Sequence, residues 1–310
     1  MAMRIPVVYH PGFAVSIGEG HIMPIGKFAL VAEALAHHPS AMMRKPEPIS
    51  LADLARVHTA EYIQAVHTGE PRALAESQRF SWSPQLFPAV RLTNGGVLEA
   101  AVQALEVGIA ACLASGFHHA CADHGEGFCT FNGLIVTLDA LFACGKIQRG
   151  AILDMDLHYG NGTAQLAASR PHVQALSIYG SDYWANTPYI DHSVRRHDDG
   201  ENHHSAILPN GCNGAEMARI MDATLPLLLA KGKPDILLYQ AGADPFREDP
   251  YSPLDLGFDD LKSRDKKVFS FCRKHSIPIA WVLAGGYTRE IQKVVDVHVN
   301  TFTACTEVYL

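Results

Sequence analysis

One stretch of the sequence, residues 150–163, restricts what this chain can fold into more than any other. Its apolar start, residues 151–153, is typical of the end of a buried β-strand. Asp154, Asp156 and His158 follow, each separated from the next by one apolar residue. Because side chains alternate between the two faces of a strand, these three are predicted to lie on one side. Such a group is costly to bury without a partner.

A divalent cation would offset that cost. Asp oxygen and His nitrogen atoms are ordinary ligands of catalytic zinc, which keeps one coordination position open for water. Gly160 and Gly162 come next and are expected to provide the backbone freedom for a sharp exit from the strand. The alternative interpretation is a helix N-cap followed by ordinary polar loop residues.

The composition argues against several classes of protein. A net charge of −7 disfavours a non-specific nucleic-acid binder, which needs a basic surface, and weakly fits a basic substrate such as a lysine-bearing segment. The seven cysteines are scattered and form no CxxC pair, so neither a disulfide framework nor a cysteine zinc site is expected. The sequence lacks a signal-peptide pattern and a membrane-spanning apolar run, and we therefore expect a cytoplasmic protein with no membrane partner.

Apolar runs alternate with amphipathic segments along most of the chain. Strands are predicted at residues 5–9, 54–58, 151–153, 173–178, 235–239 and 277–283, and helices at 27–38, 59–66, 95–113, 132–144, 163–168, 215–230, 258–274 and from about 289 onward. Residues 77–93 and 180–215 are expected to be loops. This alternation predicts an α/β fold with a parallel sheet covered by helices on both faces. Because no linker or repeat interrupts it, we predict one domain over residues 1–310.

Polar clusters follow three of the predicted strands. They are residues 154–158, Gly242-Ala243-Asp244 and Gly285-Gly286-Tyr287. In an open parallel sheet, ligands bind beyond the carboxyl ends of the strands, so the three clusters are predicted to share one active site. Asp244 could complete a two-Asp, one-His zinc site with Asp156 and His158, although a helix-capping Asp is the alternative.

Two further motifs carry candidate catalytic groups. His118 and His119 can both reach a site only from a bent loop, which Gly116 would permit; two imidazoles there suit general-base and general-acid work near neutral pH. The chain has 17 His and other His-His pairs, so a chance pair is the alternative. Tyr287 could donate a hydrogen bond to a carbonyl oxygen as charge develops on it, or it could be a core tyrosine. Phe128 could form an aromatic wall or be a core residue.

Taken together, these motifs closely resemble one family. The segments are Asp154-x-Asp156-x-His158-x-Gly-Asn161-Gly, Gly-Phe-His118-His119-Ala, Gly127-Phe-Cys-x-Phe-Asn132, Ala-Gly-Ala-Asp244 and Gly-Gly-Tyr287. In this order, over nearly the whole chain, they resemble the zinc-dependent histone deacetylases, and Val57-His58-x-x-Glu-Tyr and Ser177-Ile-Tyr look most like the class IV branch and its bacterial relatives. The resemblance implies an arginase-like α/β domain with an eight-stranded, mostly parallel sheet.

The resemblance also implies a role for each matching residue. Asp156, His158 and Asp244 would bind one zinc ion; His119 would be the general base, His118 its partner, and Tyr287 would polarise the amide carbonyl. Asp154, with Ser177 and Ile178, would contribute to a potassium site, and Asn161 would orient His119. Gly127, Phe128 and Gly286 would line a substrate tunnel, with Tyr183 or Trp184 as a guess for its second wall. The implied reaction removes acetyl or longer acyl groups from lysine side chains of proteins or peptides.

Two departures from the family pattern and three alternative functions remain. Asn161 stands where class I enzymes carry Asp, and residues 77–93 contain no acidic residue to clasp a peptide backbone. A small acylated amine such as an acetylpolyamine is therefore an alternative substrate. A binuclear manganese ureohydrolase would need a carboxylate where Gly160 stands. A non-enzymatic metal-stabilised binding protein would not need His118, His119 and Tyr287.

Overall fold

The core of the computed structural model is one eight-stranded sheet in which every pair of neighbouring strands is parallel. The structure describes residues 4–182, 187–188 and 201–310. The strand order is β2-β1-β3-β10-β9-β4-β5-β8. The strands are β1 (Ile5–Val8), β2 (Ala41–Arg44), β3 (Ile109–Ser115), β4 (Gly150–Asp154), β5 (Val173–Tyr179), β8 (His203–Ile207), β9 (Ile236–Ala241) and β10 (Ile279–Leu283). A two-stranded ladder joins β6 (Ser181–Asp182) and β7 (Thr187–Pro188).

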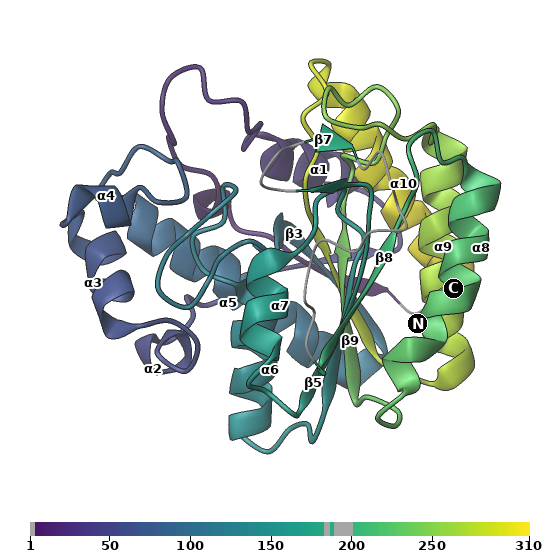
Figure 1. Cartoon of the computed structure of the whole chain (residues 1–310), viewed down its shortest axis with the longest axis horizontal. Coiled ribbons are helices and arrows are strands. Elements are labelled where there is room, and N and C mark those ends of the chain that lie inside the picture. The colour runs from purple at the N-terminus through teal and green to yellow at the C-terminus, as the bar shows by residue number, and fades with distance from the viewer. Residues whose placement is uncertain (1–3, 183–186, 189–200) are drawn as a thin grey trace.

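Helices cover both faces of this sheet (Figure 1). They are α1 (Lys27–Ala36), α2 (Leu51–Leu54), α3 (Ala60–Thr68), α4 (Arg72–Ala75), α5 (Leu86–Val107), α6 (Gly133–Ala143), α7 (Asn161–Ala167), α8 (Gly214–Thr224), α9 (Phe258–His275) and α10 (Ile291–Tyr309), with 3₁₀ turns η1 (Pro11–Phe13) and η2 (Leu225–Leu229). Figure 1 shows α2 to α7 on one side of the sheet and α8 to α10 on the other, where α1 packs on α10.

The covered faces explain the strand sequences. All residues of β3, β4, β5, β9 and β10 are buried, as expected for parallel strands with helices on both faces. The largest cluster of buried apolar side chains in the described chain runs from Ile5 to Cys305. It agrees with the predicted single domain, which stays a prediction. In the described part of the chain, we find no helix that combines the length and the apolar character needed to cross a membrane.

The sequence misplaced several boundaries in the N-terminal half. The predicted helix 95–113 is wrong at both ends: α5 begins at Leu86, inside the expected loop, and ends at Val107. Pro88 is tolerated because the amides of the first helical turn have no intrahelical partner. Gly108 ends the helix with a φ of 93°, and Ile109 then begins β3, so an alanine-rich apolar run that suits a helix is a central strand.

Short elements were also missed. The strand predicted at 54–58 is wrong: a one-turn helix, α2, capped by Ser50, ends at Leu54, and residues 55–58 form a turn. Both β2 and β8 lie at the edges of the sheet, where strands are short and less apolar, and β8 falls within the expected loop 180–215. The predicted helix 215–230 continues past Thr224 only as a 3₁₀ turn.

Candidate active site

Four neighbouring strands end at the candidate site. In the order β3-β10-β9-β4, their carboxyl ends lead into the segments that carry His118, Tyr287, Asp244 and Asp156. The sequence prediction that polar clusters after separate strands meet at one edge of the sheet is therefore confirmed. Asp156 and His158 lie beyond the end of β4 rather than within it, so the loop that follows the strand brings them together.

Asp156, His158 and Asp244 form a buried cluster with the composition of a metal site. One ligand atom from each lies within 4.8 Å of the others. The His158 Nδ1 atom is 3.2 Å from Asp156 Oδ1 and 3.2 Å from Asp244 Oδ2. Backbone amides hold the carboxylates: Leu157 donates to Asp244 Oδ1 (3.0 Å) and Gly285 donates to Asp156 Oδ2 (2.7 Å). The backbone of the surrounding loops therefore fixes the orientation of the two candidate ligand carboxylates.

The charges at this cluster fit a cation. Burial and the neighbouring Asp156 carboxylate raise the pKa of Asp244 to about 7. Burial alone would lower the pKa of His158, but its hydrogen bonds to the two carboxylates raise it well above the usual value. Two buried carboxylates therefore share one site and repel each other, which a bound divalent ion would relieve. Two oxygen ligands and one nitrogen also match the donor set of a catalytic zinc with an open position.

The glycines around the cluster matter more for the space left by their missing side chains than for the backbone conformations they adopt. A Cβ atom on Gly285 would lie 1.9 Å from Asp244 Oδ2, and one on Gly160 would lie 2.5 Å from Asp154 Oδ2. A Cβ atom on Gly162 would meet the backbone of Ala120 at 2.3 Å. Gly160 and Gly162 were expected to provide the backbone freedom for a sharp exit from the strand, but their φ angles are not positive. What these two glycines permit is close packing of the neighbouring groups. Gly286 does require glycine, with a φ of 146°.

His118 and His119 lie on the predicted bent loop, but the bend has a different origin. Phe117 carries the left-handed conformation, with a φ of 59°, whereas a Cβ on Gly116 would collide with the Gln240 side chain at 2.4 Å. The two imidazole centroids are 3.9 Å apart. The amide of Thr163, in the first turn of α7, donates to the His118 carbonyl (2.9 Å), so α7 supports this loop.

The two histidines have different partners and opposite pKa shifts. His118 Nδ1 is 2.6 Å from Asp154 Oδ2; although burial opposes it, the charges of Asp154 and Asp156 raise the pKa of His118 to about 9. His119 Nδ1 is 2.6 Å from Asn161 Oδ1, and burial together with the charge of His118 lowers the pKa of His119 well below its usual value. The pair therefore combines one imidazole that favours its charged form with one that favours its neutral form.

Glu126, which the sequence reasoning missed, extends the contacts of His119. The Asn161 Nδ2 group donates to Glu126 Oε2 (2.6 Å) while Asn161 Oδ1 faces His119. A carboxylate only accepts hydrogen bonds, so it fixes which end of the amide points to His119. The Nδ1 atom of His119 must then carry the proton, which leaves Nε2 as the basic nitrogen. The one available signal was an acidic residue between Gly125 and Gly127.

We expect the Glu126→Ala substitution to lower kcat by about 10-fold without loss of the metal at the Asp156, His158 and Asp244 cluster, because Asn161 would lose the partner that fixes its orientation. Steady-state kinetics and metal analysis of the purified variant check this. The matched control is Asp123→Asn, which changes a carboxylate that contacts His124 and leaves the contact between Glu126 and Asn161 in place. Equal kcat values for Glu126→Ala and the parent would contradict the assigned role.

A small cavity opens beside the cluster. Its lining residues are Met23, Ser115, Phe117, His118, Gly127, Phe128, Cys129, Asp156, Gln240, Ala284, Gly285 and Tyr287. The Phe128 and Tyr287 rings are 6.1 Å apart and line the same cavity. Gly127 also lines it, and so does Gly285, but Gly286 is not among the lining residues. Tyr183 and Trp184 lie outside the described residues.

The backbone of the Tyr287 segment is held by hydrogen bonds to two buried charged side chains. Sequence reasoning missed both residues. Asp249 Oδ2 accepts a hydrogen bond from the Tyr287 amide (2.6 Å). Lys27, from the start of α1, is fully buried and donates to the Ala284 carbonyl, with its Nζ 5.9 Å from the centre of the Tyr287 ring. Burial lowers the pKa of Lys27 to about 8, although nearby carboxylates, Asp244 first among them, oppose this shift. Burial raises the pKa of the Tyr287 phenol well above its usual value, so the phenol is neutral.

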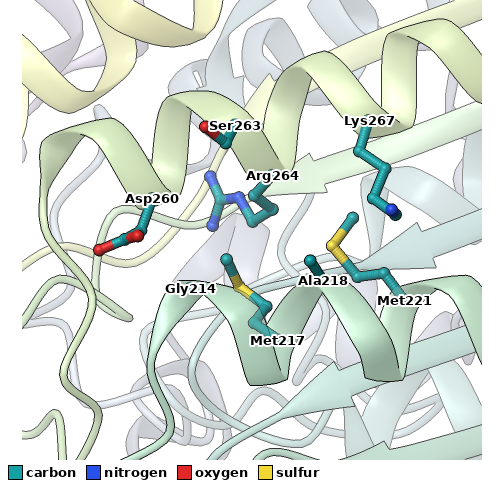
Figure 2. A pocket seen from close by; sticks show the side chains of 8 residues that line it. All are labelled: Gly214, Met217, Ala218, Met221, Asp260, Ser263, Arg264 and Lys267. Atoms are coloured by element: carbon teal, nitrogen blue, oxygen red, sulfur yellow. The ribbon is translucent and has the colours of Figure 1, made fainter.

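Arg264 of α9, which sequence reasoning also missed, contacts the backbone of the loops that carry the cluster. Its Nη1 group donates to the Gly242 carbonyl (2.8 Å) and lies 3.4 Å from the Met155 carbonyl, next to two of the candidate ligands. Asp265 Oδ1 accepts from its Nε at 2.8 Å. Figure 2 shows its side chain at a pocket between α8 and α9, beside Met217. This pocket has none of the candidate catalytic groups.

The residues predicted for a monovalent cation lie on adjacent strands. Asp154 of β4 is paired in register with Ser177 of β5, and Ile178 follows in the same strand. The Ser177 Oγ atom is buried and has no hydrogen-bond partner among the described residues. A buried hydroxyl without a partner beside a carboxylate is a chemically suitable surrounding for a cation that prefers oxygen ligands.

Acidification should destabilise the fold through His58. Its Nδ1 lies 2.9 Å from the Cys121 carbonyl and its Nε2 accepts from the Asn132 amide (3.0 Å), and burial lowers its pKa to about 4. An unfolded His takes up a proton near pH 6.5, so stability is full above that pH and falls as the pH drops toward 4, by about 2 kcal/mol at pH 5.

Urea unfolding at pH 7.5 and pH 5 measures this effect. The His58→Gln variant should be less stable at pH 7.5 and lose this part of the pH dependence, while the exposed control His37→Gln should keep all of it. If His58→Gln and the parent lost the same free energy of unfolding between the two pH values, the assignment to His58 would be wrong.

The comparison with known proteins now identifies the family. A sequence model of the histone deacetylase domain matches residues 21–302. The chain belongs to the histone deacetylase family. This histone deacetylase-family chain is 31% identical over 311 residues to an uncharacterised protein of Picosynechococcus sp., covering 99% of this chain and all of that protein. It is 29% identical to histone deacetylase 2 of Arabidopsis thaliana, covering 94% of this chain and 77% of that protein.

The solved structures agree in fold. Acetylpolyamine aminohydrolase from Burkholderia pseudomallei matches with a TM-score of 0.77 at 22% identity, covering 98% of this chain and 99% of that chain. The predicted arginase/deacetylase-like fold with an eight-stranded parallel sheet is thus confirmed. Membership of the histone deacetylase family supports a hydrolase that acts on amide bonds. Acetylpolyamine amidohydrolase 1 of Pseudomonas aeruginosa is also 29% identical, covering 56% of this chain and 49% of that protein, so family membership leaves the acylated amine open.

Proposed function

We propose that this protein is a zinc-dependent amidohydrolase that removes acyl groups, acetyl or longer, from lysine side chains of proteins or peptides. The observation that carries the proposal is the buried Asp156, His158 and Asp244 cluster, which follows β4 and β9 at the same edge of the sheet as Tyr287 after β10 and the His118–His119 loop after β3. A metal that served only to stabilise the fold would not need two imidazoles with opposite pKa shifts beside it.

The reaction needs a proton acceptor, an oxyanion partner and a proton donor. When bound, zinc supplies a Lewis acid for the amide carbonyl and the attacking water. His119 accepts the water proton at Nε2, because its Nδ1–H group already donates a hydrogen bond to Asn161 Oδ1. Tyr287, a neutral phenol, donates a hydrogen bond to the carbonyl oxygen as negative charge develops. His118 stabilises charge or assists as the acid, and an imidazolium protonates the leaving amine, so that amide and water give amine and carboxylate.

The surroundings of these groups support the same proposal. Phe128 and Gly127 line the cavity and would contact the apolar stem of the lysine. Asp154, Ser177 and Ile178 would hold potassium, for which the unpartnered Ser177 hydroxyl is the supporting observation. The alternative substrate is a small acylated amine such as an acetylpolyamine. It is favoured by the absence of acidic residues in 77–93, where larger relatives carry one that clasps the peptide backbone.

A substrate panel tests the proposal and separates the two substrate classes. Acyl-lysine peptides with acyl chains of increasing length and acylated polyamines are assayed with the zinc-loaded protein. We expect hydrolysis of acyl-lysine peptides that is lost after treatment with a chelator and returns with added zinc. Hydrolysis confined to the polyamines would favour the alternative substrate. Rates that stay unchanged after the chelator has removed all metal would contradict zinc dependence.

A further inference from the structure

A second group of metal-binding side chains lies in the loop between β3 and α6. Cys121, His124 and Glu126 each offer a ligand atom, and these atoms lie within 4.8 Å of one another. Cys121 is buried, the Glu126 side chain is 13% exposed and the His124 side chain is 37% exposed. The cluster is therefore close to the surface, and an ion could reach it from solvent past His124. The roles assigned above to the active-site residues use neither Cys121 nor His124.

The His124 ring is already oriented as a ligand. Its Nδ1 lies 2.7 Å from Asp123 Oδ1, which leaves Nε2 turned toward Glu126 Oε1 at 3.2 Å. A carboxylate that holds the far nitrogen of an imidazole is the usual arrangement around a metal-binding His. Two nitrogen or oxygen ligands of a tetrahedral zinc, each about 2.0–2.1 Å from the ion, lie about 3.3 Å apart. The corresponding separations in the Asp156, His158 and Asp244 cluster are the same 3.2 Å.

We propose that Cys121, His124 and Glu126 form a second divalent-cation site, separate from the Asp156, His158 and Asp244 cluster. The donor set of thiolate, imidazole and carboxylate favours zinc and similar transition metals over magnesium or calcium, which prefer oxygen ligands alone. Burial and the nearby carboxylates of Glu126 and Asp123 raise the pKa of the free Cys121 thiol to about 12, so binding of the ion would release a proton.

This site is directly connected to the candidate general base. Glu126 presents Oε1 to His124 and Oε2 to Asn161 Nδ2, and the Asn161 Oδ1 atom faces His119. One carboxylate thus bridges the two groups. An ion bound to Glu126 Oε1 would be linked to the His119 ring through Glu126 and a single amide side chain, without touching the active-site cavity.

Cobalt(II) substitution tests the proposal with a signal that the active-site cluster cannot give. The Asp156, His158 and Asp244 cluster contains no sulfur, so a thiolate-to-cobalt charge-transfer band in the near ultraviolet reports on a cysteine ligand alone. We expect the metal-free protein to bind two equivalents of cobalt, the band growing with one of them. The Cys121→Ser variant should bind one equivalent and show no band, whereas the exposed matched control Cys144→Ser should behave like the parent.

Two results would overturn the proposal: a parent protein that binds a single equivalent without the band, or a band that persists in Cys121→Ser. If Cys121→Ser does not fold, as judged by circular dichroism, the partly exposed His124→Asn variant takes its place. It should bind the second equivalent at least 10-fold more weakly; unchanged affinity would contradict the site. Absence of amide hydrolysis would count against the proposed function and would leave the cobalt band unaffected.

Discussion

The Gly285→Ala variant is expected to lose its metal and nearly all of its activity. A methyl group at this position would lie 1.9 Å from Asp244 Oδ2 and 2.8 Å from Asp156 Oδ2, far inside van der Waals contact, so both candidate ligands would have to move. The Gly285 amide also donates to Asp156 Oδ2 (2.7 Å), and its displacement would release that carboxylate. Loss of a Lewis acid worth several kcal/mol corresponds to a rate loss on the order of 10³-fold or more.

Metal content per chain and kcat/KM, measured on the same preparation, check this prediction. Gly26→Ala is the matched control, because a Cβ atom there meets nothing within 4 Å and the φ of −62° suits alanine. The control should keep one zinc equivalent at the active site and the parental rate. A Gly285→Ala protein with full metal content and undiminished kcat/KM would show that Asp156 and Asp244 do not hold the catalytic ion.

The second large effect is expected from the groups that handle protons. His119→Ala should reduce kcat by about 10²–10⁴-fold, the usual contribution of a positioned general base, and Tyr287→Phe by about 10²–10³-fold through loss of the hydrogen bond to the carbonyl oxygen. Neither residue belongs to the candidate ligand set, so the metal content should stay at the parental value. Retained metal with lost turnover distinguishes these variants from Gly285→Ala.

Steady-state kinetics as a function of pH provide the sharper measurement. His119→Ala should remove the acidic limb of the kcat/KM profile, because that limb reports protonation of the base, whereas Tyr287→Phe should lower the whole profile. His37→Ala, an exposed member of another His-His pair, is the control and should leave rate and profile unchanged. Variants of His119 and Tyr287 that hydrolyse every substrate at the parental rate would refute the assigned roles.

The sequence indicated which candidate ligands would come together because their pattern is local. Asp156 and His158 stand two residues apart, Asp244 ends a short polar segment after a strand, and the rule that parallel strands present their carboxyl ends at one edge brings the segments together. Long amphipathic helices such as α9 were placed to within a few residues for the same reason. A pattern that is read over one element needs no knowledge of its neighbours.

The parts that were missed depend on contacts between distant segments. Lys27 donates to a carbonyl 257 residues further along the chain, and no periodicity in its helix indicates that the ammonium group is buried. The Arg264 contacts with Gly242 and Met155, and the Glu126 contact with Asn161, likewise join separate elements. The strand β3 looked helical because its small apolar residues suit either structure, and only pairing with β1 and β10 decides between them.

The position of β10 has a consequence for how the site is made. This strand is among the last elements in the chain, yet it pairs with β3 on one side and β9 on the other. Without β10 the sheet would fall into two halves: β2-β1-β3, which leads into the histidine pair, and β9-β4-β5-β8, which leads into the carboxylates. The histidine pair and the carboxylates can therefore face each other only after residues 279–283 have paired with both halves.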